Sequence, residues 1–424
     1  MTFIRRCLVS WRQAGCLMVV ACLMIQAAGV QGKTAETGIS QNVERKWVDA
    51  WSVSYLSTTV NGTPQTVPRF DNQTLRLNMF VKLGGTALRV KLTNRFATRP
   101  LVIGGAHVAL RRSSGGTVSG SEIAAETDRV LTFDGARTVK LEAGKELWSD
   151  PVYLSVKQHE DVTISLYLPE PTTPEAFHPT GLKTQYITAG DHCGDTTLQS
   201  AGLGSRTTMY FFVSDIQVMA TAKSRVIVAM GDSITDGAAS ANDINGAWPD
   251  VLSKRLAALQ DGTPVSVINM GIGSNRLVTS DAAGPTGLKR LEDDVLSRPN
   301  VSYLILLEGI NDISYEQASA EKLIAAYEQV IDKAHAKGIK VFGATLLPIQ
   351  NSRKDTPANE AARQSVNKWI RQSRRFDAVL DFEKVVQDPQ NPLRIRKDLT
   401  MDYVHPNTGG YRLMGESVNL KLFE

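Results

Sequence analysis

The C-terminal half of this chain alternates short apolar runs with stretches of helical periodicity. In the first such stretch, Trp248, Leu252, Leu256 and Leu259 recur three or four residues apart, the spacing of one helix face. Apolar strands that alternate with helices are typical of a parallel sheet covered on both faces. The sequence therefore predicts a doubly wound α/β fold with a closing helix from Thr408 to Leu422. Its five strands are expected at Arg225–Met230, Val265–Met270, Val301–Leu307, Lys340–Leu347 and Ala378–Phe382.

The preceding part of the chain, from about residue 45 to 220, has a different pattern. Runs such as Leu75–Val81 and Val162–Leu168 largely alternate apolar and polar residues, which predicts strands with one buried face. Glycine pairs and prolines separate these runs, and no amphipathic helix is evident. We therefore expect an all-β sandwich or jelly-roll domain over residues 33–222, followed by an α/β domain over residues 223–424.

Residues 1–32 differ from both parts. Three Arg residues precede an apolar stretch from Cys16 to Ile25, and small residues follow it. This pattern indicates a secretory signal peptide and hence a secreted or periplasmic protein. A membrane anchor is the alternative, although the stretch is shorter than the roughly 20 residues that a spanning helix needs. Lipidation at Cys22 is a third interpretation, because Val19-Val20-Ala21-Cys22 loosely fits a bacterial lipobox.

Removal of this leader changes the charge and the cysteine content. The leader holds three Arg and no acidic residue, so the formal net charge falls from +4 to +1 without it. A nearly neutral protein has no broad field for nucleic acid or an anionic membrane, and we expect neither as a partner. Only Cys193 of the four cysteines remains, which excludes an intramolecular disulfide. The sequence does not fix the oligomeric state.

Polar residues follow the predicted strands of the α/β domain and return near the C-terminus. Ser233 follows the first strand, and Asp402 and His405 lie three residues apart in Asp402-Tyr403-Val404-His405-Pro406. Residues three apart share one side of a helical turn, so one short segment could present imidazole and carboxylate together. Serine, histidine and aspartate are the nucleophile, base and orienting acid of a hydrolytic triad. Ser233 could instead only cap the following helix.

Four sequence blocks in this order resemble the SGNH (GDSL) hydrolase superfamily. They are Gly231-Asp232-Ser233, the loop Asn269–Arg276, Gly309-Ile310-Asn311-Asp312 and Asp402–Pro406. The β-rich N-terminal part, with Trp47–Trp51 and Ser149–Val152, makes the chain similar to a subgroup of secreted esterases and acylhydrolases with an N-terminal β-domain. The resemblance implies a flavodoxin-like sheet order, no cofactor, and hydrolysis of carboxylic esters.

By this resemblance, three groups would form an oxyanion hole: the backbone N–H of Ser233, a backbone N–H at Ser274, and the side-chain amide of Asn311. Gly273 is an alternative donor in the same loop. The family usually has glycine at the position of Ser274. A main-chain donor needs no particular side chain, but a backbone with positive φ would be unfavourable for serine.

Two further interpretations compete with the esterase. Asp232, Asp236, Asp312 and His405 could bind a hard cation for phosphoester hydrolysis, which would leave Ser233 and Asp402 without a purpose. A catalytically silent carbohydrate-binding protein is the alternative from another class. Among ester substrates, the resemblance favours an acetylated carbohydrate, with a lipase, lysophospholipase or arylesterase as alternatives.

Overall fold

The computed structural model describes residues 44–424, apart from residues 61, 115–116, 199–203 and 260–262. The predicted leader with Cys22 lies outside the described residues, and its assignment stays a prediction. Within the described residues, no helix is long and apolar enough to cross a membrane. Cys193 is buried and has a free thiol.

The C-terminal part contains the predicted parallel sheet. Its five strands have the order β19-β18-β20-β21-β22, and every neighbouring pair is parallel. In chain order this is 2-1-3-4-5, the flavodoxin-like order, so the predicted fold class is confirmed. The strands β18 and β20 are buried over most of their length, as their apolar sequences require. The strands are β18 (Arg225–Gly231), β19 (Val265–Gly271), β20 (Val301–Leu307), β21 (Lys340–Ala344) and β22 (Ala378–Leu380).

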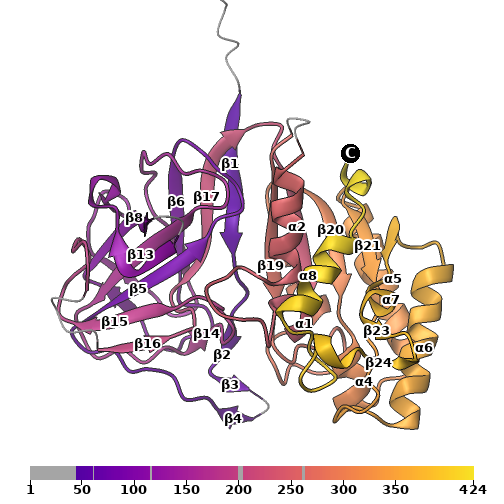
Figure 1. The fold of residues 1–424 in the computed structure, drawn as a ribbon. Coiled ribbons are helices and arrows are strands. Elements are labelled where there is room, and N and C mark those ends of the chain that lie inside the picture. Colours follow the sequence, from indigo (N-terminus) through magenta and orange to yellow (C-terminus); the bar gives the residue numbers. More distant parts are fainter. Residues whose placement is uncertain (1–43, 61, 115–116, 199–203, 260–262) are drawn as a thin grey trace, which may run out of the picture. The chain divides into compact units, whose positions relative to one another are not determined.

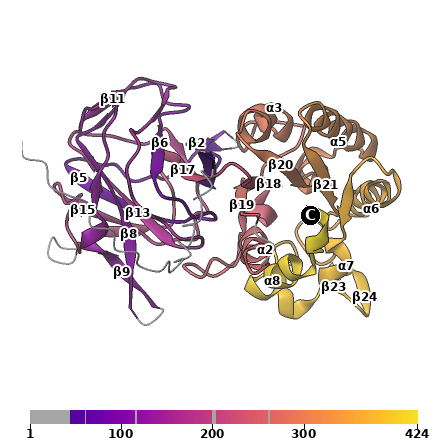
Figure 2. The same ribbon diagram turned by 90° about the horizontal axis from the view of Figure 1, so that it is seen from above.

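Helices cover both faces of this sheet (Figure 2). One face carries α2 (Trp248–Ala257), α7 (Phe382–Val386) and α8 (Thr408–Ser417), and the other carries α3 (Gly287–Leu291), α5 (Ala320–His335) and α6 (Pro357–Gln372). Short elements complete this part: α1 (Ser233–Asp236), α4 (Ile310–Glu316), a π-turn (Glu292–Leu296) and 3₁₀ turns at Lys397–Leu399 and Leu420–Phe423. The closing helix ends at Ser417 and not at Leu422, because Val418 is extended and a separate 3₁₀ turn follows Asn419.

The N-terminal part consists of antiparallel strands, as predicted (Figure 1). One sheet has the order β1-β17-β6-β12 and the other β10-β8-β13-β5-β15-β16, with β9 paired to β8, and their apolar side chains share one core. The first sheet is β1 (Arg45–Ser52), β17 (Val213–Thr221), β6 (Leu88–Thr93) and β12 (Glu146–Trp148). The second is β10 (Arg129–Val130), β8 (Gly105–Ser114), β13 (Asp161–Leu168), β5 (Gln73–Phe80), β15 (Gln185–Ala189), β16 (Ser205–Thr207) and β9 (Thr117–Ile123). Short pairs in this part are β2 (Leu56–Ser57) with β14 (Ala176–Phe177), β3 (Thr59–Val60) with β4 (Thr63–Pro64), and β7 (Leu101–Ile103) with β11 (Val139–Leu141). The C-terminal part holds one such pair among its described residues, β23 (Gln387–Asp388) with β24 (Asn391–Ile395).

The prediction of strands with one buried face is wrong for β5. Leu75 and Leu77 lie in the core, but Arg76 between them is also fully buried. The Arg76 guanidinium donates to the Ser165 hydroxyl and to the backbone carbonyls of Ser121 and Asp195. Polar side chains on this face are therefore covered by the loops around it, and their hydrogen bonds offset the cost of burial.

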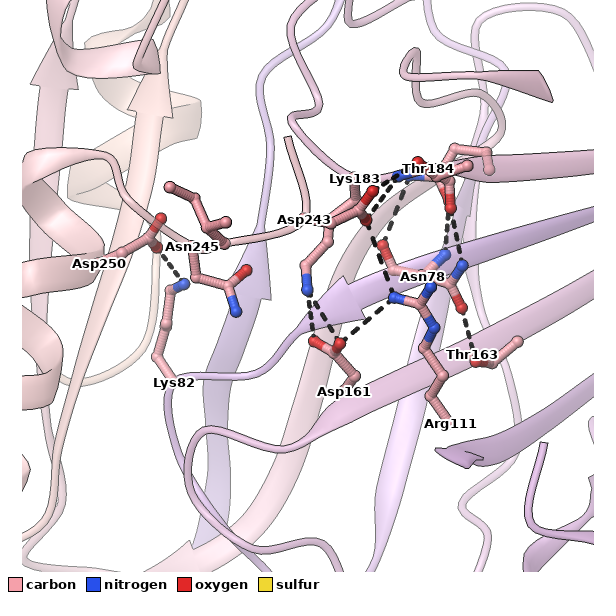
Figure 3. Close-up of polar contacts among 12 residues, drawn as sticks. Asn78, Lys82, Arg111, Asp161, Thr163, Lys183, Thr184, Asp243, Asn245 and Asp250 are labelled. Carbon is pink, nitrogen blue, oxygen red and sulfur yellow. Dashed lines mark hydrogen bonds and ion pairs between the residues drawn. The ribbon is translucent and has the colours of Figure 1, made fainter. Parts of the chain in front are cut away.

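Charged side chains connect the β-rich part to the α/β part (Figure 3). Lys82, just after β5, forms an ion pair with Asp250 on α2. Arg111 on β8 lies 3.5 Å from Asp161 and 3.9 Å from Asp243, which belongs to the loop between α1 and α2. The Lys82–Asp250 pair is largely buried and is therefore costly to break, whereas Asp243 is exposed and its longer contact with Arg111 contributes little. The proposed domain boundary at residues 222 and 223 falls between β17 and β18.

Candidate active site

Ser233 lies at the carboxyl edge of the parallel sheet. It is the first residue of α1 and follows β18 after a single residue, Asp232, whose carboxylate accepts a hydrogen bond from the Ile234 N–H at 2.9 Å. The end of β19 approaches α1 so closely that a Cβ atom on Gly271 would collide with the backbone of Asp236. Strand end and helix are therefore packed rigidly around the Ser233 hydroxyl.

A continuous hydrogen-bond chain joins Ser233, His405 and Asp402. Ser233 Oγ lies 2.8 Å from His405 Nε2, and His405 Nδ1 lies 2.8 Å from Asp402 Oδ2. Burial raises the pKa of Asp402, but hydrogen bonds from the His405 backbone N–H and imidazole and from Val404 outweigh it, so the pKa is lowered overall. The carboxylate is thus ionised at neutral pH and holds the imidazole with Nε2 toward the hydroxyl.

The segment that presents these two residues is not a helical turn, contrary to the prediction from their spacing. Residues 401–405 form a series of bends, and Tyr403 has a φ of 56°. Asp402 Oδ1 accepts hydrogen bonds from the Val404 and His405 N–H groups at 2.9 and 2.8 Å. Thr400 Oγ1 donates to the His405 carbonyl. The side chain of Asp402 therefore shapes the loop that also orients the base, which a three-residue spacing alone does not reveal.

Asn311 lies between the two loops that carry the other predicted oxyanion donors. It belongs to the first turn of α4, and its side chain is buried. Asn311 Nδ2 donates to the Asn275 carbonyl at 2.9 Å and lies 3.4 Å from Asp232 Oδ2. These partners are the neighbours of Ser274 and Ser233, so the ends of three adjacent strands meet here.

Ser274 adopts the left-handed conformation that its side chain makes unfavourable, with a φ of 60°. Asp312 of the Gly309–Asp312 block holds the segment that follows this loop. Its carboxylate accepts hydrogen bonds from the N–H groups of Leu277, Val278 and Thr279 at 2.7 to 3.0 Å. The same loop positions Gly273, where a Cβ atom would meet only Asp236 Oδ2 at 4.0 Å. The serine is therefore tolerated in a glycine-type conformation.

Replacement of Ser274 by glycine is expected to relieve this strain. A left-handed conformation costs an L-residue about 1–2 kcal/mol, and the greater chain entropy of glycine offsets about 0.5–1 kcal/mol of that gain. The free energy of unfolding of Ser274→Gly should thus rise by up to about 1 kcal/mol in urea titrations. Esterase activity should stay within about twofold, because a backbone donor needs no side chain. The β-branched variant Ser274→Val is the comparison and should be the less stable of the two. If Ser274→Gly were less stable than Ser274→Val, the backbone at this position would not be strained.

The carboxylates of the alternative metal site point to different partners. Asp312 is saturated by the loop described above, and Asp236 Oδ1 lies 3.1 Å from His178 Nε2. Asp402 and Ser233 occupy both nitrogens of His405. Across the part of the chain that the structure describes, no group of three or more His, Cys, Asp or Glu residues is arranged to hold a metal ion. The donor geometry thus fits the hydroxyl–imidazole–carboxylate chain better than a cation site.

Two residues near the site had no motif to mark them. Arg290 on α3 is buried and donates to the carbonyls of Gly231 and Met270 and to Asn275 Oδ1. It therefore links the ends of β18 and β19 to the loop that carries Ser274. His178 comes from the β-rich part and is not among the candidate site residues named from the sequence. It is buried, and its imidazole bridges the Ser54 carbonyl and Asp236, the last residue of α1.

The His178–Asp236 pair is expected to make stability depend on pH. Burial lowers the pKa of His178, but the attraction and hydrogen bond of Asp236 and the Ser54 carbonyl outweigh it and raise the pKa above 6.5. A raised pKa means that charged His178 stabilises the fold fully below about pH 6.5, and that this stabilisation is lost as pH rises through the folded-state pKa.

Removal of His178 should therefore lower the free energy of unfolding most at acidic pH. His178→Ala is expected to lower the free energy of unfolding by about 3 kcal/mol at pH 6, because it leaves a buried carboxylate uncompensated. The difference from the unmodified protein should shrink at pH 9, as measured by urea unfolding. His335→Ala is the matched control, since the His335–Asp377 pair is about 40% exposed and should contribute under about 1 kcal/mol. Equal losses in the two variants would contradict the expectation.

An imidazole held between a serine hydroxyl and a carboxylate, at the carboxyl edge of a doubly wound sheet, is the arrangement of serine hydrolases. Residues 229–413 match the model of the GDSL-like lipase/acylhydrolase family. The C-terminal part of the chain thus matches the family that the four blocks predicted, and the protein is a carboxylic ester hydrolase. No curated protein matches the chain.

Solved structures resemble a little under half of the chain. A G-D-S-L family protein from Desulfitobacterium hafniense, described as lipolytic, is 25% identical, with 46% of this chain and 98% of that chain covered and a TM-score of 0.36. A carbohydrate acetylesterase family member from Sinorhizobium meliloti is 16% identical (46% and 94% covered, TM-score 0.38). An acetyl xylan esterase is 25% identical (45% and 96% covered, TM-score 0.36). Because these TM-scores are below 0.5, the family assignment rests on the sequence match.

Proposed function

We propose that this protein is a secreted serine esterase that works through an acyl-enzyme on Ser233. His405 takes the proton of the hydroxyl as Oγ attacks the ester carbonyl, and Asp402 stabilises the resulting imidazolium. The amide of Asn311 and backbone N–H groups at Ser233 and Ser274, with Gly273 as the alternative, stabilise the negative oxygen. His405 then protonates the leaving alcohol, and water releases the acid by the reverse sequence. The single observation that carries this mechanism is the 2.8 Å contact between Ser233 Oγ and His405 Nε2.

A short acyl group and a polar alcohol fit the surroundings of the hydroxyl best. Three buried side chains beside the site are polar or charged and are joined by contacts: Asp232, Asn311 and Lys354. A long acyl chain would have to displace their hydrogen bonds, which is unfavourable. Tyr315, one turn after Asn311 on α4, is 45% exposed and places an aromatic side chain near the site. We therefore propose an acetylated carbohydrate as the substrate.

Two measurements test this function. A p-nitrophenyl phosphonate should add its phosphonyl group to the peptide that contains Ser233 in the native protein, and not in a Ser233→Ala variant; labelling elsewhere alone would reject the mechanism. For the acyl group, kcat/KM on p-nitrophenyl esters should be highest for acetate and fall with chain length. An optimum at eight or more carbons would instead assign a lipase, a preference for aryl acetates over acetylated sugars an arylesterase, and a lack of any turnover a carbohydrate-binding protein.

Secretion is part of the proposal and is supported by the Arg-rich, apolar leader of residues 1–32. Expression of the full chain in a bacterial host, followed by cell fractionation, tests it. The mature protein should leave the cytoplasm and begin near residue 33, whereas a fatty acid on Cys22 would show a lipid anchor.

A further inference from the structure

Lys354 is a buried lysine beside the proposed oxyanion hole that the mechanism above does not use. It lies in the loop between β21 and α6, and only 4% of the residue is exposed. Its ammonium donates a hydrogen bond to Asn311 Oδ1 at 2.8 Å. A lysine is rarely buried unless it has a partner, and this one is directed at a neutral amide within the site.

The contact fixes which end of the Asn311 amide faces the substrate. An amide presents an oxygen acceptor at one end and an NH₂ donor at the other, and the two can exchange by a 180° rotation. An ammonium group has only donors, so the amide oxygen must face it. The nitrogen then points to the other side, where it contacts the Asn275 carbonyl and Asp232 Oδ2. That side carries Ser233, where an ester oxygen would gain negative charge.

The ammonium is itself held in place. Its nitrogen lies 4.2 Å from the centre of the Tyr315 ring, a cation–π contact. The backbone of Lys354 is fixed by two further hydrogen bonds: its N–H donates to Ser352 Oγ, and its carbonyl accepts from Asn359 Nδ2 at 2.9 Å. The group that orients the amide is therefore anchored independently of the substrate.

Charges on several elements act on this ammonium. Burial lowers the pKa of Lys354 to about 8, since the carboxylates of Asp232 and Asp402 compensate burial only in part while Arg353 and Arg276 oppose the charge. Lys354 is therefore charged at neutral pH and loses its proton in mildly alkaline solution. A neutral amine also carries a lone pair and can accept from the amide nitrogen, so Lys354 then ceases to enforce the orientation, and only the Asn275 carbonyl and Asp232 still favour it.

We propose that Lys354 is a positioning residue for ester hydrolysis, whose ammonium holds the Asn311 amide with its nitrogen toward the developing oxyanion. This inference rests on the proposed function. It predicts that Lys354 acts on kcat through Asn311 and does not contact the substrate's reacting atoms.

The test compares Lys354→Met, Lys354→Arg and the exposed control Lys368→Met with p-nitrophenyl acetate between pH 6 and 10. Methionine keeps the apolar stem of lysine but has no donor. Lys354→Met should therefore lower kcat about tenfold at pH 7 with little change in KM. This loss is smaller than the loss in kcat on removal of an oxyanion donor itself. The unmodified protein should lose kcat with an apparent pKa near 8. Arginine has only donors and does not titrate, so Lys354→Arg should recover much of kcat at pH 7 and abolish the alkaline decline. The control should leave both kcat and the pH profile unchanged.

A double-mutant cycle with Asn311→Ala separates positioning from general stabilisation. Once the amide is absent, Lys354→Met should have no further effect on kcat, whereas additive losses would overturn the proposal. An unchanged kcat in Lys354→Met, with Ser233→Ala inactive, would overturn the role of Lys354 alone; equal activity of Ser233→Ala and the unmodified protein would instead reject the proposed function. If Lys354→Met does not fold, Lys354→Arg decides, because an alkaline decline that persists in that variant refutes the role.

Discussion

Replacement of Ser233 by alanine is expected to lower kcat on p-nitrophenyl acetate by at least about 1,000-fold, because no other group would form the acyl-enzyme. His405→Ala should cause a loss of similar size, and the double variant should be little worse than either alone, since nucleophile and base act as a unit. KM should change little in each. The hydroxyl does not support the fold, so thermal unfolding of Ser233→Ala should match the unmodified protein within about 1 kcal/mol.

The matched control for this experiment is Ser365→Ala. Ser365 lies on the exposed side of α6, where its hydroxyl bonds only to the Ala361 carbonyl. Its removal should leave kcat unchanged. Turnover by Ser233→Ala at the rate of this control would show that hydrolysis occurs elsewhere and would remove the acyl-enzyme mechanism.

The second large effect is expected for Asn311→Ala, which should lower kcat about 100- to 1,000-fold with KM within a few-fold. Removal of one oxyanion donor typically has this cost, because the donor acts mainly on the transition state. Asn311→Asp is a sharper variant: it retains an oxygen for Lys354 but replaces the NH₂ donor by a second acceptor, so its kcat should fall at least as far.

Stability must be measured in parallel, because Asn311→Ala also leaves the Lys354 ammonium without its partner. Urea unfolding of both variants must accompany the kinetics. The aspartate keeps a partner for Lys354 but sets its second oxygen against the Asn275 carbonyl and Asp232 Oδ2, so it should also be less stable than the unmodified protein. If kcat of folded Asn311→Asp remained within threefold of the original, the amide would not be an oxyanion donor.

The arrangement of the α/β part was predictable because each of its elements has a local sequence pattern, and the alternation of apolar runs with helical periodicity repeats along the chain. Each apolar run became a strand of the parallel sheet, since only a strand buried on both faces suits a short continuous apolar segment. Ser233, His405, Asp402 and Asn311 stand out because they lie in blocks with a fixed order, and the structure brings Ser233, His405 and Asp402 into one hydrogen-bond chain.

Long-range partners could not be predicted in the same way. His178 reaches Asp236 across 58 residues, and Lys354 reaches Asn311 across 43, with no local pattern on either histidine or lysine. The helical turn expected for Asp402 and His405 was wrong, because the Asp402 side chain competes for the backbone N–H groups that a helix would use. Strand β5 was read as half-buried, because the loops that cover Arg76 lie far away in sequence.

The contact between His178 and Asp236 has a consequence for how this chain could evolve. The serine-bearing helix ends on a carboxylate whose counter-charge is supplied by the other half of the polypeptide. A gene fusion that exchanged the N-terminal half for an unrelated domain would remove His178 and leave Asp236, at the end of the helix that begins with Ser233, without its cationic partner. A replacement N-terminal half would therefore have to supply its own cation for Asp236, or the helix that carries Ser233 should lose stability.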